Sequence, residues 1–244
     1  MKCIVLVGGY ATRMHPIAVN KPKALLELND NTVLDNILDN IIRSSNIIDE
    51  YILVTNDTFY EQFINWKNKN NYKENITIIS DGSTSKDNKI GSVSAVIKTI
   101  NDSKIDDDIL IMAGDNIIDF SLQYIFDEFI NNNNSCIMYY EEQDKKKLSK
   151  TGIIELDDNN FVLGMEEKPI NPKTNYAVPP FYWLKKKDIK KLLSLFSNNT
   201  KIDAMGEIIL SLCQHTKIKG LKMNGKRYDI GSIDEYHSLK QNRR

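Results

Sequence analysis

The sequence has few cysteines, and none of them is paired at the spacing of a redox motif. Only Cys3, Cys136 and Cys213 occur, they lie far apart in apolar surroundings, and there is no C-x-x-C. A disulfide framework is therefore not indicated. This pattern favours packed thiols in a reducing compartment.

Long apolar runs are also lacking. No stretch approaches the ~20 apolar residues that are needed to span a bilayer. The chain enters an apolar segment at once, without the charged region and apolar run of a signal peptide. We therefore expect a cytoplasmic protein with no membrane partner.

An excess of charge of one sign is missing as well. The chain of 244 residues has 32 Lys and Arg against 33 Asp and Glu, a net charge of −1. This balance argues against a nucleic-acid-binding surface, although a local basic pocket remains compatible with it. The length suits one large α/β domain, or a domain with a smaller lobe, and no internal repeat is present.

The two common nucleotide fingerprints are absent. G-x-x-x-x-G-K-[ST] does not occur, which disfavours a P-loop NTPase. G-x-G-x-x-G does not occur either, which disfavours the dinucleotide-binding fingerprint.

What is present is a regular alternation of strands and helices over about the first 140 residues. The predicted strands are 3–7, 51–55, 76–80, 109–113 and 136–140, and the predicted helices are 33–42, 59–69, 91–100 and 121–131. This alternation predicts a three-layer, Rossmann-like α/β fold. Its sheet should be mixed and mainly parallel, with helices on both faces and the ligand site at the carboxyl ends of the strands. The later segments 152–156, 161–163, 176–184, 217–223 and 227–230 read as strands of an antiparallel or mixed extension, and 188–196, 205–213 and 232–240 as helices.

The first strand ends in a glycine turn that is followed by two cations. Gly8 and Gly9 let the backbone turn sharply and approach a ligand closely, and Arg13 and Lys23 follow. Exposed N–H groups together with Arg and Lys suit phosphate oxygens. A plain strand-to-loop turn is the alternative explanation for the two glycines.

A second candidate is Asp115 in Gly114-Asp115-Asn116, directly after a buried strand. A carboxylate at the end of a central strand can bind Mg²⁺, while a simple strand-end turn is the alternative. The D-x-D in Asp106-Asp107-Asp108 precedes its strand, so we interpret it as a solvated turn.

Together these motifs resemble those of the sugar-phosphate nucleotidylyltransferase family. Residues 8–14, Gly-Gly-Tyr-Ala-Thr-Arg-Met, followed by Pro22-Lys23, are similar to G-G-x-G-T-R-[LM] and P-K. Ala11 stands where the family most often has Gly, so a positive φ at this position would be strained. Glu167-Lys168-Pro169 resembles the family's E-K-P, and residues 227–231, Arg-Tyr-Asp-Ile-Gly, resemble its W-x-D-x-G.

The resemblance implies roles for individual residues. The nucleotide-binding residues would be Gly8, Gly9, Thr12, Arg13, Lys23 and Gly91. The sugar-phosphate-binding residues would be Asn116, Gly152, Glu167, Lys168 and Tyr176. The Mg²⁺ ligands would be Asp115 and Asp229. The catalytic groups would be Arg13, Lys23, Asp115 and Lys168.

It also implies an activity and an organisation. The expected reaction joins a nucleoside triphosphate to a sugar 1-phosphate, with glucose 1-phosphate and dTTP or UTP as the preferred pair. Cytidylyl or guanylyl transfer to mannose 1-phosphate, phosphocholine or a phosphonate stays open, as does a metal-dependent glycosyltransferase. A non-catalytic, nucleotide-binding relative is disfavoured because both aspartates are present. Residues 1–140 would form the nucleotide-binding half and 141–244 the sugar-phosphate-binding half of one catalytic domain, which could form a homo-oligomer.

Overall fold

The computed structural model describes residues 1–11, 14, 18, 20–196 and 202–242. The chain folds into two compact units, each assembled from separate stretches of sequence. The glycine-loop unit contains residues 2–89, 113–123 and 224–244, and the Glu167 unit contains residues 1, 90–112 and 124–223. The predicted division into functional halves at residue 140 stays a prediction.

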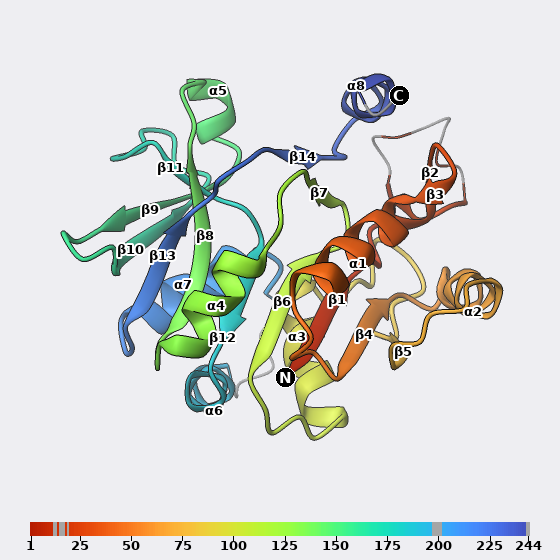
Figure 1. The fold of residues 1–244 in the computed structure, drawn as a ribbon, viewed down its shortest axis with the longest axis horizontal. Coiled ribbons are helices and arrows are strands. Elements are labelled where there is room, and N and C mark those ends of the chain that lie inside the picture. The colour runs from red at the N-terminus through yellow and green to blue at the C-terminus, as the bar shows by residue number, and fades with distance from the viewer. Residues whose placement is uncertain (12–13, 15–17, 19, 197–201, 243–244) are drawn as a thin grey trace. The chain divides into compact units, whose positions relative to one another are not determined.

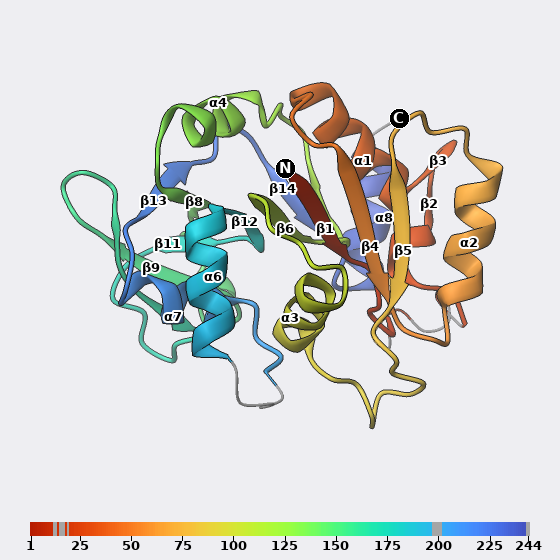
Figure 2. The same cartoon turned by 90° about the horizontal axis from the view of Figure 1, so that it is seen from below.

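The glycine-loop unit is built on three parallel strands in the order β1-β4-β5 (Figure 1). Its strands are β1 (Lys2–Leu6), β2 (Glu27–Leu28), β3 (Asn31–Thr32), β4 (Glu50–Thr55), β5 (Ile76–Ser80), β7 (Asn116–Ile118) and β14 (Arg227–Asp229). Its helices are η2 (Lys23–Leu25), α1 (Val33–Ser44), α2 (Tyr60–Lys69) and α8 (Ile233–Asn242). Helix α2 packs beside β5, as Figure 2 shows, and α1 packs against β7.

Helix α1 shows how local sequence sets this arrangement. Thr32 accepts a hydrogen bond from the Asp35 N–H, and the Asp35 carboxylate accepts one from the Thr32 N–H, which completes a capping box. Apolar residues then recur at helical spacing and are buried: Val33, Leu34, Ile37, Leu38 and Ile41. Burying side chains of this size stabilises the fold by about 1.5–3 kcal/mol each. The helix was predicted at this place, over residues 33–42.

The strands of the Glu167 unit lie in the order β10-β9-β11-β8-β12-β6, and β13 pairs with β8 as well. These strands are β6 (Ile109–Ala113), β8 (Ser135–Glu141), β9 (Gly152–Leu156), β10 (Val162–Glu167), β11 (Tyr176–Val178), β12 (Phe181–Leu184) and β13 (Ile218–Lys222). The helices are α3 (Ser92–Asp102), α4 (Gln123–Asn131), α5 (Lys145–Leu148), α6 (Lys186–Leu195) and α7 (Gly206–Cys213). Strand β12 runs antiparallel to both β6 and β8, whereas β13 runs parallel to β8.

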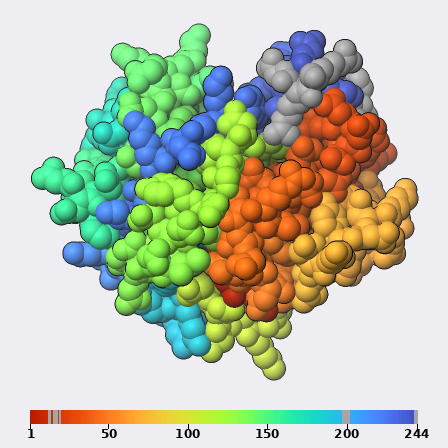
Figure 3. All heavy atoms as spheres, in the orientation of Figure 1, coloured from red at the N-terminus to blue at the C-terminus, as the bar shows by residue number. Residues whose placement is uncertain are grey.

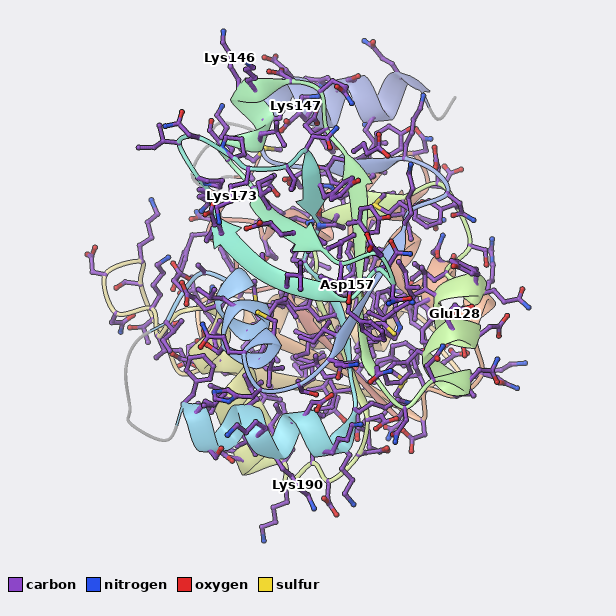
Figure 4. The ribbon with its side chains drawn as sticks, turned by 90° about the vertical axis from the view of Figure 1, so that its left-hand side faces the viewer. Glu128, Lys146, Lys147, Asp157, Lys173 and Lys190 are labelled. Carbon is purple, nitrogen blue, oxygen red and sulfur yellow. The ribbon has the colours of Figure 1, made fainter. Side chains whose placement is uncertain are left out.

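Several charge runs of the sequence lie on outer faces. Lys146 and Lys147 of α5 and Lys190 of α6 are exposed and point away from the ribbon in Figure 4. The outer faces of α1 and α2 also reach the surface, as the space-filling view in Figure 3 shows. Charged side chains on these faces are exposed to solvent, as is usual for Lys, Arg, Asp and Glu.

The predicted α/β class with a mixed sheet is confirmed. All three cysteines are free, as predicted, and burial raises the pKa of the Cys136 thiol to about 12. Among the described residues, no helix is both long and apolar enough to cross a membrane.

Candidate functional site

The glycine turn follows β1 and packs against the end of β4. A Cβ at Gly8 would lie only 3.1 Å from the Asn56 backbone nitrogen, a tight contact that glycine avoids. The Asn56 side chain is buried, donates to the Gly8 carbonyl at 2.7 Å and accepts from the Phe59 N–H at 2.9 Å. Asn56 therefore fixes the turn, a role that was not predicted for it.

Ala11 has φ +48°, the left-handed conformation that glycine adopts most easily. The strain that was predicted for a positive φ at this position is therefore present. The Met14 N–H donates to the Ala11 carbonyl at 2.8 Å and closes the turn. Thr12 and Arg13 lie outside the described residues, so their predicted contacts with phosphate stay predictions.

Asp115 is brought to this edge by the glycine before it. The Gly114 N–H donates to the Leu6 carbonyl at 2.8 Å, and a Cβ at Gly114 would lie 2.5 Å from Val7 Cγ1. A larger residue here would push Asp115 away from the end of β1. Lys23 Nζ then donates to Asp115 Oδ2 at 3.1 Å, and the Lys23 side chain is only 15% exposed.

The second predicted ligand, Asp229, lies next to Asp115. Strands β7 and β14 are antiparallel, with Asp229 opposite Asn116, and the Ile230 N–H donates to the Asp115 carbonyl at 3.0 Å. Loss of water around the Asp229 carboxylate raises its pKa, and the negative charge of Asp115 raises it further. Arg227 and Lys23 act in the opposite direction. The two aspartates, more than a hundred residues apart in sequence, thus share one electrostatic environment.

Arg227 and the Asn116 side chain complete this cluster. Arg227 Nη1 donates to Asn116 Oδ1 and lies 3.5 Å from Asp229 Oδ2, and Asn116 Nδ2 donates to Asp115 Oδ1 at 2.7 Å. Arg227 belongs to one of the motifs in the sequence, but no role was predicted for it. Its signal was the alternation of a strand, because residues 227 and 229 face the same side. The predicted sugar-phosphate contact of Asn116 stays a prediction.

Two adjacent carboxylates that repel each other suit a divalent cation, because a cation removes the repulsion and prefers oxygen ligands. The donor set formed by Asp115 and Asp229 is thus compatible with the predicted metal. Within the described ranges, no group of three or more His, Cys, Asp or Glu side chains could hold a metal ion.

The D-x-D at residues 106–108 lies in the turn before β6, where it was predicted. Asp106 pairs with Lys186 at 2.6 Å, Asp107 with the amino terminus at 2.8 Å, and Asp108 with Lys185 at 3.3 Å. Each of these carboxylates therefore has a cationic partner within the Glu167 unit.

The Glu167 unit holds a half-buried carboxylate between two glycines. A Cβ on Gly206 would overlap Glu167 Oε2, and one on Gly152 would lie 3.3 Å from the same oxygen and overlap Met165. Burial raises the pKa of Glu167, Lys168 lowers it and Glu207 raises it further. Gly152 was among the predicted site residues. Gly206 was not, because one glycine inside a predicted helix carries no functional signal.

Lys168 and Tyr176 follow Glu167 in the sequence. Lys168 Nζ lies 3.8 Å from Glu167 Oε1, and the Lys168 side chain is 61% exposed. Its φ of +51°, directly before Pro169, is a sparsely populated conformation that costs about 1–3 kcal/mol. Tyr176 packs edge-on against Tyr139 at 5.2 Å between ring centroids. The predicted contacts of Lys168 with a sugar phosphate and of Tyr176 with the sugar stay predictions.

Gly91, the predicted base contact, caps α3 at φ +95°. A Cβ at this position would lie 2.5 Å from the Ile202 carbonyl oxygen. The Ser92 N–H donates to Asp203 Oδ1 at 3.1 Å, which ties the start of α3 to the segment before α7. Gly91 therefore has a structural reason to be glycine, and its contact with a base stays a prediction.

We predict that Glu167→Gln stabilises the protein at neutral pH. With its pKa raised in the folded state, Glu167 binds a proton more tightly there than in the unfolded chain. The free energy of unfolding should therefore fall as pH rises from the ordinary glutamate pKa to the raised pKa of Glu167. Above the raised pKa, the ionised carboxylate continues to destabilise the folded state. The measurement is urea unfolding at about pH 4 and about pH 8. The variant should have a higher free energy of unfolding than the wild type only at the higher pH.

The matched control is Glu166→Gln, because Glu166 is the more exposed neighbour on the same strand. An equal increase in the free energy of unfolding in both variants would contradict the proposal that burial of Glu167 destabilises its charged form. No increase in Glu167→Gln would contradict it as well.

Comparison with known proteins gives a consistent result. A family model described as nucleotidyl transferase matches residues 2–244. The bifunctional protein GlmU of Methanocaldococcus jannaschii is 27% identical over 236 residues, which cover 95% of this chain and 51% of that protein. The UTP–glucose-1-phosphate uridylyltransferase AglF of Haloferax volcanii is 22% identical over 242 residues, 99% of this chain and 96% of its own. The chain thus spans about half the length of the GlmU relatives that it matches.

Solved structures share the fold. A Bacillus anthracis structure described as a glucose-1-phosphate thymidylyltransferase has a TM-score of 0.83 at 19% identity, covering 99% of this chain and 94% of its own. A UDP-glucose pyrophosphorylase complexed with UDP-glucose has a TM-score of 0.81 at 20% identity, covering 99% and 97%. At this level of identity the similarity establishes the architecture alone.

Proposed function

The chain belongs to the nucleotidyl transferase family, and on that premise we propose that it transfers a nucleotidyl group from a nucleoside triphosphate to a sugar 1-phosphate. The products are a nucleotide-sugar and pyrophosphate. The observation that carries this proposal is the meeting of Asp115, directly before β7, with Asp229 at the end of the neighbouring strand β14, with Lys23 and Arg227 beside them.

The chemistry fits such a site because the nucleophile needs no activation by the protein. A sugar phosphate is already an anion at neutral pH, and its oxygen attacks the α-phosphorus in line while pyrophosphate leaves. The obstacle is repulsion between anions, so catalysis rests on positioning and positive charge. A Mg²⁺ ion held by Asp115 and Asp229 would supply charge neutralisation at the α-phosphate.

In the glycine-loop unit, the chain's own groups act on the triphosphate. The Gly8 and Gly9 amides, Thr12 and Arg13 bind the phosphates that leave, and Lys23 moves from Asp115 to neutralise the α-phosphate. The 3.1 Å pair with Asp115 supports this role, because it keeps the Lys23 ammonium at the site before substrate arrives.

In the Glu167 unit, Glu167 accepts hydrogen bonds from vicinal sugar hydroxyls, which a carboxylate can do with both oxygens. Lys168 neutralises the phosphate of the sugar, and Gly152 and Tyr176 line the sugar. Gly152 and Gly206 support this assignment because they leave room around the Glu167 carboxylate.

The substrates we favour are glucose 1-phosphate with dTTP or UTP. This choice rests on the names of relatives, the uridylyltransferase AglF and a glucose-1-phosphate thymidylyltransferase of Streptomyces griseus that is 28% identical over 182 residues. A glycosyltransferase is less favoured because the D-x-D at residues 106–108 lies in the turn before β6. Ligand sites in sheets of this kind lie at the carboxyl ends of the strands instead.

The test is pyrophosphate release, measured with the four common triphosphates against a panel of sugar 1-phosphates. The proposal expects release only when both substrates and a divalent cation are present. Consumption of a nucleotide-sugar without pyrophosphate chemistry would instead identify a glycosyltransferase. Nucleotide binding without turnover would identify a non-catalytic relative.

We expect Gly206→Ala to raise KM for the sugar 1-phosphate about tenfold or more, with little change in KM for the triphosphate. The added Cβ would overlap the Glu167 carboxylate and displace it. Steady-state kinetics with each substrate varied in turn measures the split. Gly164→Ala is the matched control, because a Cβ at Gly164 meets nothing within 4 Å. An equal rise in KM for both substrates, or an unchanged KM for the sugar 1-phosphate, would contradict the placement of the sugar at Glu167.

A further inference from the structure

The Asn116 side chain is buried, 3% exposed, between a cation and an anion. Its Oδ1 accepts from Arg227 Nη1, and its Nδ2 donates to Asp115 Oδ1 at 2.7 Å. The other oxygen of Asp115 accepts from Lys23 Nζ at 3.1 Å. An unbroken chain of hydrogen bonds therefore runs from Arg227 through Asn116 and Asp115 to Lys23.

The chemistry of the partners fixes the orientation of the amide. A guanidinium has only donors, so the carbonyl oxygen of Asn116 must face Arg227. An ionised carboxylate has only acceptors, so the NH₂ group must face Asp115. The flipped amide would set donors against donors and oxygen against oxygen. Arg227 thus selects the one orientation in which Asn116 can hold Asp115.

We propose that Arg227 and Asn116 are positioning residues that act in series to hold the Asp115 carboxylate in the orientation that binds a divalent cation. The inference rests on the proposed function in one respect, that Asp115 and Asp229 are the metal ligands. Each Asp115 oxygen uses one lone pair on the protein and keeps another for the metal. Partners that orient a metal ligand in this way typically contribute 10- to 100-fold to metal affinity.

A purely electrostatic role for Arg227 makes the opposite prediction. Its guanidinium lies 3.5 Å from Asp229 Oδ2, and a cation at this distance repels a bound metal ion. If charge were its only contribution, removing Arg227 would strengthen metal binding. If it acts through Asn116, removing it weakens binding. The sign of the change separates the two explanations.

The experiment measures binding of Mn²⁺ alone by electron paramagnetic resonance, without substrates. We expect Arg227→Gln and Asn116→Ala each to weaken Mn²⁺ binding about tenfold or more. The double variant should be no weaker than Asn116→Ala, because Arg227 acts through the amide. Lys226→Gln is the matched control: it removes the same charge from the residue directly before β14 and should leave binding unchanged or slightly tighter. Arg227→Met, of similar length and without donors, is a second test should the first variant fold poorly, with circular dichroism as the check.

Tighter or unchanged Mn²⁺ binding in Arg227→Gln overturns the inference, as does a double variant in which the two losses add. The proposed function fails separately. If wild-type protein binds no Mn²⁺, or if Asp115→Asn binds it as well as wild type, the metal site itself is wrong.

Discussion

Asp115→Asn is expected to lower the rate of nucleotidyl transfer about 100-fold or more, while the protein stays folded. Asparagine keeps the size of the side chain and its place beside Lys23, but it removes one of the two carboxylate charges that would hold the cation. Loss of one preorganised charge at a site of this kind commonly costs 10² to 10³ in kcat. Because Asp115 is partly exposed, losing its ion pair with Lys23 should cost no more than about 1 kcal/mol of stability.

The measurement is pyrophosphate release under saturating substrates, with thermal unfolding beside it. Asp106→Asn is the control, since Asp106 is the exposed first member of the D-x-D and has its own lysine partners. We expect near-normal turnover in that variant. Near-normal turnover in Asp115→Asn would remove the basis of the metal site, and a crippled Asp106→Asn would move the metal to residues 106–108.

The elements of the fold could be predicted because their patterns are local. The apolar spacing and cap of α1, and the short buried run of β1 before Gly8, each depend on a few neighbouring residues. Pairing between distant strands is not encoded in this way. Strand β12 is short and fully buried, and nothing in its four residues indicates that it runs antiparallel to both β6 and β8.

The candidate site could also be predicted only in part, because part of it depends on contacts between distant residues. Asp115 and Asp229 could be proposed from their motifs, but their adjacency depends on β7, a strand of three residues that was not predicted. Ile117 and Ile118 were its only sequence signal. Asn56, Arg227 and Gly206 were missed because their importance comes from what lies opposite them in space: the Gly8 carbonyl, the Asn116 amide and the Glu167 carboxylate.

Lys23→Ala is expected to reduce kcat about 100-fold, with a smaller change in KM for the triphosphate. The Lys23 ammonium is held at the site by Asp115 and is only 15% exposed, so it is available to the α-phosphate without rearrangement of solvent. The charge distribution on the transferring phosphate changes most in the transition state. The interaction of the Lys23 ammonium with this group is therefore strongest in the transition state, and its loss should lower kcat. Steady-state kinetics with the triphosphate varied gives the split between kcat and KM.

Lys21→Ala separates this role from a general loss of positive charge. Lys21 lies two residues away, 41% exposed, and pairs with Glu27 at 3.6 Å. Its removal changes the net charge equally, so steering of an anionic substrate should weaken to a similar, salt-sensitive extent in both variants. Only Lys23→Ala should lower kcat at saturating substrate. If both variants lower kcat equally, the loss reflects a general effect of positive charge and not a specific role of Lys23. If Lys23→Ala changes KM alone, then Lys23 binds the ground state. In either case the neutralising charge at the α-phosphorus must come from another cation.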